Sequence, residues 1–133
     1  MPPESEPGHR RLVLITGSAP TARATAARYT SGARPLWISD APPSAARSLP
    51  PGRARDALGS DETAVVFDLF SGLDVDALAA SSGLVRGGGA FIVAAPPLRE
   101  WSRRSGAPVS RRQIQNALER FRARFEAAGF GPA

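Results

Sequence analysis

The stretch that decides the fold is residues 63–97, TAVVFDLFSGLDVDALAASSGLVRGGGAFIVAAPP. It holds two continuous apolar runs, residues 65–67 and 91–93, on either side of a segment with apolar residues at helical spacing. Continuous apolar runs are typical of parallel strands whose two faces are both covered by helices. Asp74 and Asp76 favour the positive, amino-terminal end of the intervening helix. The stretch therefore predicts a strand-helix-strand unit of a parallel sheet.

The preceding part of the chain repeats this alternation. Residues 12–15 are fully apolar and predict a first strand, and a helix is expected from Pro20 to about Tyr29. Residues 36–38 predict a short second strand. Residues 41–53, dense in Pro, Ser and Ala, predict a loop with at most a helical turn. About four strands alternating with helices indicate a small Rossmann-like α/β domain of three layers with a mostly parallel sheet.

The two ends of the chain differ from this central part. Residues 1–9 are rich in Pro, Glu and Ser and predict a disordered leader, so residues 10–133 are expected to form a single domain. Near the other end, Ser110 and Gln113 match a capping box. The apolar residues that follow at helical spacing predict a carboxy-terminal amphipathic helix whose apolar stripe packs on the sheet.

Composition excludes several classes of site. The chain has no cysteine, which excludes disulfides and thiolate chemistry, and its one histidine, His9, lies in the leader. No catalytic residue and no metal site are predicted. No apolar run approaches the roughly 20 residues of a membrane span, and residues 1–11 lack the apolar core of a signal peptide. We therefore expect a cytoplasmic protein with no membrane partner.

The distribution of charge suggests RNA as a partner. The formal net charge of +5 falls entirely in residues 99–133, since residues 1–98 contain as many acidic residues as arginines. Arginine contacts phosphates through two nitrogens, and tryptophan offers a stacking surface for an unpaired base. A solvated helix face would carry similar charge, so both interpretations stay open. The residues predicted to bind RNA are Arg99, Trp101, Arg103, Arg104, Arg111, Arg112, Arg120 and Arg124.

The loops after the predicted strands suggest a second, enzymatic interpretation. Gly17 and Ser18 stand between a strand and a helix, where phosphate loops lie, but the chain has no lysine to complete a P-loop. Asp40 lies near the spacing of the acid that binds ribose in dinucleotide folds, and Asp68 ends a strand. These four residues would serve a stand-alone nucleotide- or S-adenosylmethionine-binding enzyme. An ordinary strand-to-helix turn, a capping or turn role for Asp40 and backbone hydrogen bonds to Asp68 are the favoured explanation of these residues.

The order of several short motifs resembles a known family. The residues concerned run from a first strand ending Leu14-Ile15-Thr16-Gly17 through Leu36-Trp37-Ile38-Ser39, Leu58-Gly59, Val65-Val66-Phe67-Asp68, Gly72-Leu73-Asp74, Ala77, Gly83-Leu84 and Gly87-Gly88-Gly89 to Pro96-Pro97. This succession resembles the N-terminal domain of bacterial tRNA(Met) cytidine acetyltransferase, over about Arg10 to Trp101. On its own, the glycine triplet is expected to be a tight turn between a helix and a strand.

The resemblance implies a family function that this chain does not contain in full. The family enzyme joins this domain to an ATP-hydrolysing helicase-like module, an acetyltransferase module and a tRNA-binding tail. It forms N4-acetylcytidine at the wobble position of elongator methionine tRNA, using ATP and acetyl-CoA. This sequence ends before any Walker lysine or acetyl-CoA loop, so no cofactor is expected here. The resemblance implies a non-catalytic accessory domain whose partners are tRNA or the helicase and acetyltransferase modules, and a purely structural domain with a protein partner is a third hypothesis.

Overall fold

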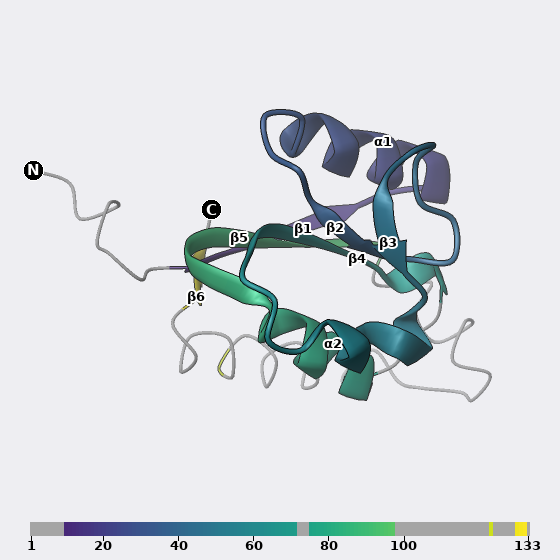
Figure 1. Cartoon of the computed structure of the whole chain (residues 1–133). Coiled ribbons are helices and arrows are strands. Elements are labelled where there is room, and N and C mark those ends of the chain that lie inside the picture. The colour runs from purple at the N-terminus through teal and green to yellow at the C-terminus, as the bar shows by residue number, and fades with distance from the viewer. Residues whose placement is uncertain (1–9, 72–74, 98–122, 124–129, 133) are drawn as a thin grey trace, which may run out of the picture.

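A parallel sheet lies between two layers of helices in the computed structural model, which describes residues 10–71, 75–97, 123 and 130–132 (Figure 1). The sheet order is β3-β2-β4-β5-β1-β6, and every pairing is parallel. The predicted α/β class and parallel sheet are thus confirmed. The strands are β1 (Arg10–Thr16), β2 (Leu36–Ile38), β3 (Arg47–Leu49), β4 (Glu62–Asp68), β5 (Val85–Ala95) and β6 (Phe130–Pro132). The helices are α1 (Ala19–Tyr29) and α2 (Val75–Ser82), with short 3-10 turns η2 (Pro51–Ala57) and η3 (Leu69–Ser71).

The core lies on both faces of the two central strands. On one face Phe67 and Phe91 pack with their ring centroids 6.4 Å apart, against a cluster that includes Leu78 of α2. On the other face Val66 and Ile92 pack in the cluster that contains the small residue Ala26 of α1. Because both faces are covered, the strands carry no alternation of apolar and polar residues. This is the physical reason for the continuous apolar runs in the sequence.

The direction of each connection explains which face its helix covers. The chain crosses the sheet in one direction from β1 to β2 through α1, and in the opposite direction through η2 and through α2. Since such crossovers are right-handed, opposite directions place helices on opposite faces. Figure 1 shows α1 above the sheet and α2 below it, and α2 and η2 contact each other. Leu12 of β1 packs in the cluster on the α2 face, so Leu14, two residues on, belongs to that face as well.

Two local predictions were wrong. Residues 41–53 contain a third strand, β3, which pairs with β2 from Leu36–Arg47 to Ile38–Leu49, so the sheet has six strands instead of about four. The triplet Gly87 to Gly89 lies inside β5, not in a turn before it.

The glycine triplet forms an irregularity in the pairing of β4 with β5. Arg86 to Gly89 lie opposite Thr63 alone, because Glu62 pairs with Val85 and Ala64 pairs with Ala90. Gly88 has a φ of +83°, a left-handed conformation, and a Cβ on Gly89 would lie 2.6 Å from the carbonyl oxygen of Thr63. Only glycine fits this close approach without displacing the backbone.

Three further predictions concern residues that lie outside those described. They are the leader at residues 1–9, the helix beginning near Ser110 and the basic connection around Trp101. Each stays a prediction. No helix in the described part of the chain is both long enough and apolar enough to span a membrane.

Candidate functional site

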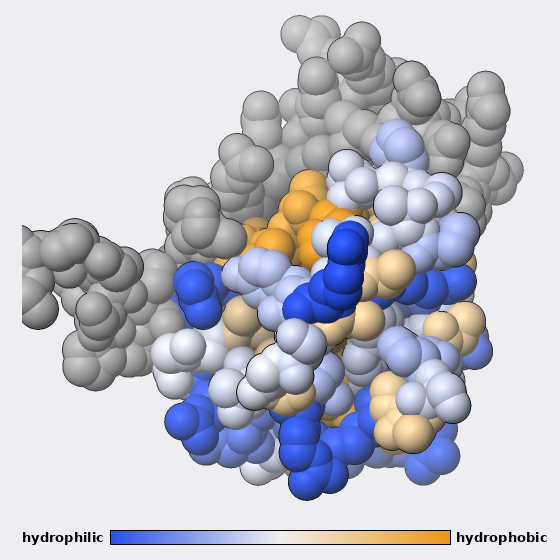
Figure 2. Space-filling view, turned by 90° about the horizontal axis from the view of Figure 1, so that it is seen from above, coloured by the Kyte–Doolittle hydropathy of each residue, from blue (hydrophilic) through white to orange (hydrophobic). Residues whose placement is uncertain are grey.

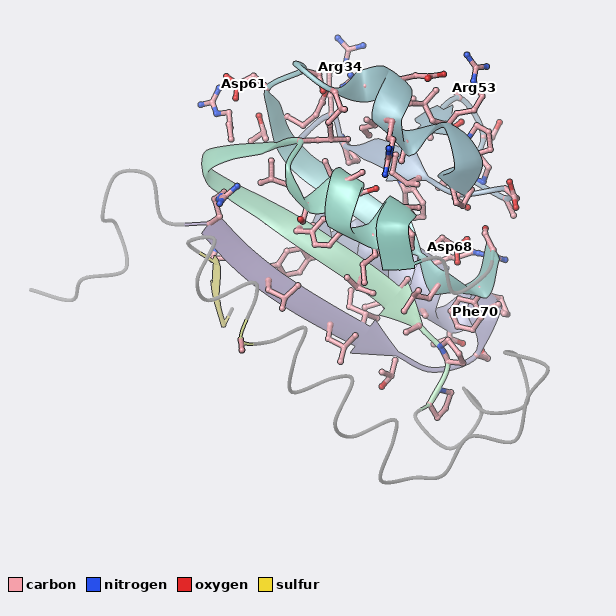
Figure 3. All side chains as sticks on the ribbon, turned by 90° about the horizontal axis from the view of Figure 1, so that it is seen from below. Arg34, Arg53, Asp61, Asp68 and Phe70 are labelled. Carbon is pink, nitrogen blue, oxygen red and sulfur yellow. The ribbon has the colours of Figure 1, made fainter. Side chains whose placement is uncertain are left out.

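The carboxyl ends of the parallel strands meet at one edge of the sheet, and the polar residues that follow them lie there. In open α/β sheets this edge carries the ligand site. Ser39 follows β2, Asp68 ends β4, and Gly17 follows β1. The structure brings Ser39 and Asp68 into direct contact. Figure 3 shows Asp68 and Phe70 together at this end of the sheet, away from Asp61.

Asp68 is the centre of the site. Its side chain is fully buried, and its Oδ2 atom accepts hydrogen bonds from Ser39 Oγ at 2.6 Å, Arg23 Nε at 2.8 Å and Ser71 Oγ at 3.3 Å. Its Oδ1 atom accepts one from the backbone N–H of Phe70 at 2.9 Å. An ionised carboxylate is stable in such a place only when it is paired and hydrogen-bonded, and these four donors meet that requirement. Asp68 therefore joins β2, β4 and α1 through one side chain.

Arg23 is the residue of this site that the sequence does not reveal. It comes from α1, 45 positions before Asp68, and its guanidinium lies over the ring of Phe70 at 5.5 Å from the ring centroid. The side chain is 25% exposed. The sequence does contain one signal, since an acid at the end of a fully apolar strand must find donors. Nothing in the sequence indicates which arginine supplies them.

The remaining loop residues of the enzymatic interpretation have local roles. Ser18 caps α1 by accepting a hydrogen bond from the Thr21 N–H, and the Gly17 N–H donates to the carbonyl of Ala95 at 3.2 Å. Asp40 is exposed, and its backbone N–H donates to Ser71 Oγ. Of the four residues in that interpretation, none joins its side chain to another. Ser18 is a helix cap, Gly17 belongs to a turn, and Asp68 is a buried acceptor of several hydrogen bonds.

A second polar cluster lies at the opposite, amino-terminal edge of the sheet. Arg47 at the start of β3 donates from both Nη atoms to the two carboxylate oxygens of Glu62 at 3.0 Å, and also to the carbonyl of Arg34. The hydrogen bond from Arg47 lowers the pKa of Glu62 and raises the pKa of Arg47 itself, and burial opposes both shifts. This pair reaches across β2 and ties β3 to β4. It explains why a strand forms in a segment of loop-like composition.

The residues predicted to bind RNA and possible metal ligands remain to be placed. All of the arginines and the tryptophan predicted to bind RNA lie outside the described residues, so their role stays a prediction. Within the described residues, no group of three or more His, Asp or Glu side chains is placed to hold a metal ion.

The face of the molecule that carries α1 is largely hydrophilic, as Figure 2 shows.

Comparison with known proteins identifies the family. The model of the family "tRNA(Met) cytidine acetyltransferase TmcA, N-terminal" matches residues 4–128. The chain belongs to this family of N-terminal domains. It is 35% identical over 97 residues to the tRNA(Met) cytidine acetyltransferase TmcA of Nitrosococcus halophilus, 33% over 105 residues to that of Yersinia pestis and 37% over 97 residues to that of Pectobacterium atrosepticum.

These matches cover most of this chain but only a small part of each relative. They cover 71%, 77% and 71% of this TmcA N-terminal domain but only 13%, 15% and 14% of the three relatives. The chain thus spans about one seventh of the length of the relatives that it matches. What the family model shares with the chain includes β1 to β5 and the whole cluster around Asp68.

Proposed function

We propose that this TmcA N-terminal domain is a non-catalytic accessory domain that contributes RNA contacts to the acetylation of the wobble cytidine of elongator methionine tRNA. The observation that carries the proposal is the match to the N-terminal part of a tRNA-modifying family over nearly the whole chain. ATP and acetyl-CoA would bind to other modules, in the same or another polypeptide. The domain would act in the cytoplasm, with tRNA.

The absence of a catalytic role is supported by the way the strand-end residues are used. A general base or a nucleophile must be able to approach a substrate. The carboxylate of Asp68 is fully buried and accepts four hydrogen bonds from its own chain. The Ser39 hydroxyl that donates to it also accepts from the Ala41 N–H. The groups best placed for chemistry at this edge are committed to holding the fold.

The RNA contact is supported by the charge of residues 99–133. This region holds eight arginines and only three acidic residues. Its arginines lie in sequence after β5 and before β6, and both of these strands pair with β1 of the sheet. Arginines contact phosphate groups through two nitrogens, which is the contact that we propose for this region.

A fluorescence-anisotropy titration with elongator methionine tRNA tests the proposal. The test variant carries Glu at Arg103, Arg104, Arg120 and Arg124. A matched control carries Glu at four exposed arginines elsewhere, and so removes the same charge. These are Arg11, Arg28, Arg34 and Arg55. Binding that weakens with salt, and that the test variant loses while the control retains part of it, would support the RNA contact, because neutralised phosphates release counterions.

The opposite results favour the other hypotheses. No binding by the wild-type chain at low salt would contradict the RNA contact and favour a protein partner such as the helicase or acetyltransferase module. Equilibrium dialysis with ATP, acetyl-CoA and S-adenosylmethionine tests the stand-alone enzyme, and we expect no uptake. The purified chain is also expected to transfer no acetyl group to RNA.

A further inference from the structure

Arg23 and Arg47 both pair with a carboxylate, but they use their guanidinium groups differently. Arg47 donates from both Nη atoms to the two carboxylate oxygens of Glu62, so this edge of its guanidinium group is occupied. Arg23 donates to Asp68 from Nε, the nitrogen nearest its own backbone. Within the described part of the chain, the Nη edge of Arg23 makes no hydrogen bond. That edge keeps the geometry which binds phosphate oxygens through two nitrogens.

The guanidinium is also held in place before any ligand arrives. Asp68 has no exposed surface and is fixed by Ser39 and by the Phe70 N–H, so the Nε bond has a rigid acceptor. The Phe70 ring lies on one side of the guanidinium plane at 5.5 Å. An arginine fixed by a carboxylate and an aromatic ring loses little side-chain entropy when it binds. At 25% exposure, its side chain remains accessible to solvent.

The position in the fold is one where ligands bind. After β2 the chain continues to β3 on one side, and after β4 it continues to β5 on the other. Asp68 and Ser39 stand at the carboxyl ends of these two neighbouring strands, which is a topological switch point. Protein side chains occupy its inner part, and Arg23 lies at its outer part.

We propose that Arg23, oriented by Asp68 and backed by Phe70, binds a phosphate group of the RNA that the domain contacts. This inference rests on the proposed RNA contact and adds a second point of contact, separate in sequence from the basic region of residues 99–133. Asp68 is a positioning residue in this arrangement. The phosphate contact itself is made by the Nη edge of Arg23.

The test compares two arginines of the same helix in the anisotropy titration. Arg23→Gln and Arg28→Gln each remove one positive charge from α1, but Arg28 is exposed and is not positioned by a carboxylate in the described structure. We expect Arg23→Gln to weaken tRNA binding about tenfold, as expected for one charge-assisted contact, and to lower the salt slope by about 1. Arg28→Gln should change either quantity only slightly.

A second variant separates positioning from charge. Asp68→Asn makes the chain more positive, so general electrostatic attraction predicts tighter RNA binding. Loss of the acceptor that orients Arg23 predicts weaker binding. We expect Asp68→Asn to bind tRNA more weakly than the wild type while its circular dichroism spectrum stays folded. If Arg23→Gln or Asp68→Asn fails to fold, Arg23→Lys keeps the positive charge but lacks the two-nitrogen edge of the guanidinium, and it should also bind more weakly.

Three results would overturn the inference. They are equal effects of Arg23→Gln and Arg28→Gln, tighter binding by folded Asp68→Asn, and wild-type affinity of Arg23→Lys. Each of them leaves the proposed RNA contact intact, which fails if the wild-type chain does not bind tRNA. Inorganic phosphate at millimolar concentration should not displace the tRNA.

Discussion

Replacing Glu62 by Gln tests how much the ion pair at the amino-terminal edge of the sheet stabilises the fold. The Glu62 side chain is 9% exposed and Arg47 is 45% exposed. Exposed pairs contribute about 0.2–1 kcal/mol, whereas breaking a fully buried pair costs about 3–5 kcal/mol. Solvent screens the arginine side, and the glutamine can still accept one hydrogen bond. We therefore expect Glu62→Gln to lower the free energy of unfolding by about 1 kcal/mol near neutral pH.

The pH dependence of this loss follows from the direction of the pKa shift. Arg47 lowers the pKa of Glu62 in the folded chain below its value in the unfolded chain. Such a carboxylate stabilises the fold fully above its unfolded pKa, about 4.3 for Glu, and the contribution is lost as the pH falls through the folded pKa. The difference between wild type and Glu62→Gln should therefore be largest near neutral pH and should shrink in acid. Urea unfolding followed by far-UV circular dichroism at several pH values measures it.

The chain supplies a matched control for this experiment. Arg53 and Asp56 form a pair with a shorter N–O distance of 2.7 Å, but their side chains are 66% and 52% exposed. Asp56→Asn should cost a few tenths of a kcal/mol at most, because solvent screens both partners. The reasoning is refuted if Glu62→Gln costs no more than Asp56→Asn near neutral pH, or if its cost is the same at every pH.

Two further substitutions test the sheet itself by urea unfolding. Gly89→Ala should cost about 1–3 kcal/mol, because its Cβ would lie 2.6 Å from a backbone carbonyl oxygen of β4, whereas Gly52→Ala meets nothing within 4 Å and should change stability by about 0.5 kcal/mol or less. Leu14→Asp should cost about 1–2 kcal/mol although Leu14 is 49% exposed, because Leu14 lies on the sheet face whose apolar cluster includes Leu12 and about half of its side chain is buried there. A neutral Gly89→Ala or a neutral Leu14→Asp would contradict the respective argument.

The main strands were predictable because their burial leaves a local signature. Residues 65–67 and 91–93 are apolar at every position, and that pattern has few alternatives in a chain with helices between the runs. β3 was not predictable, since its sequence Arg-Ser-Leu carries no such pattern. Its stability comes from a backbone pairing with β2 and from the bond between Arg47 and Glu62. Both partners lie outside the segment itself, since β2 precedes it and Glu62 follows Arg47 by 15 residues.

The candidate site shows the same division between local and non-local information. Asp68 could be singled out because it ends a continuous apolar strand, where a charged group needs donors. Phe70 and Ser71 stand next to it but carry no motif, since they act through a backbone N–H and a hydroxyl. The contact between Arg23 and Asp68 depends on how α1 lies across the sheet, and the spacing of residues in the sequence does not determine that.

The two ends of the sheet show that counting arginines does not locate a binding surface. At the amino-terminal edge, both Nη atoms of Arg47 donate to Glu62, and one of them also donates to a backbone carbonyl. This arginine therefore stabilises the pairing of strands. At the carboxyl edge, Asp68 accepts a hydrogen bond from Nε of Arg23, and the Nη atoms of Arg23 make no hydrogen bond within the described residues. An arginine therefore has a structural role at one edge, whereas at the other edge we propose that it has a recognition role. What distinguishes them is which nitrogen the carboxylate accepts from, and the contrast between Arg23→Gln and Arg28→Gln measures its consequence.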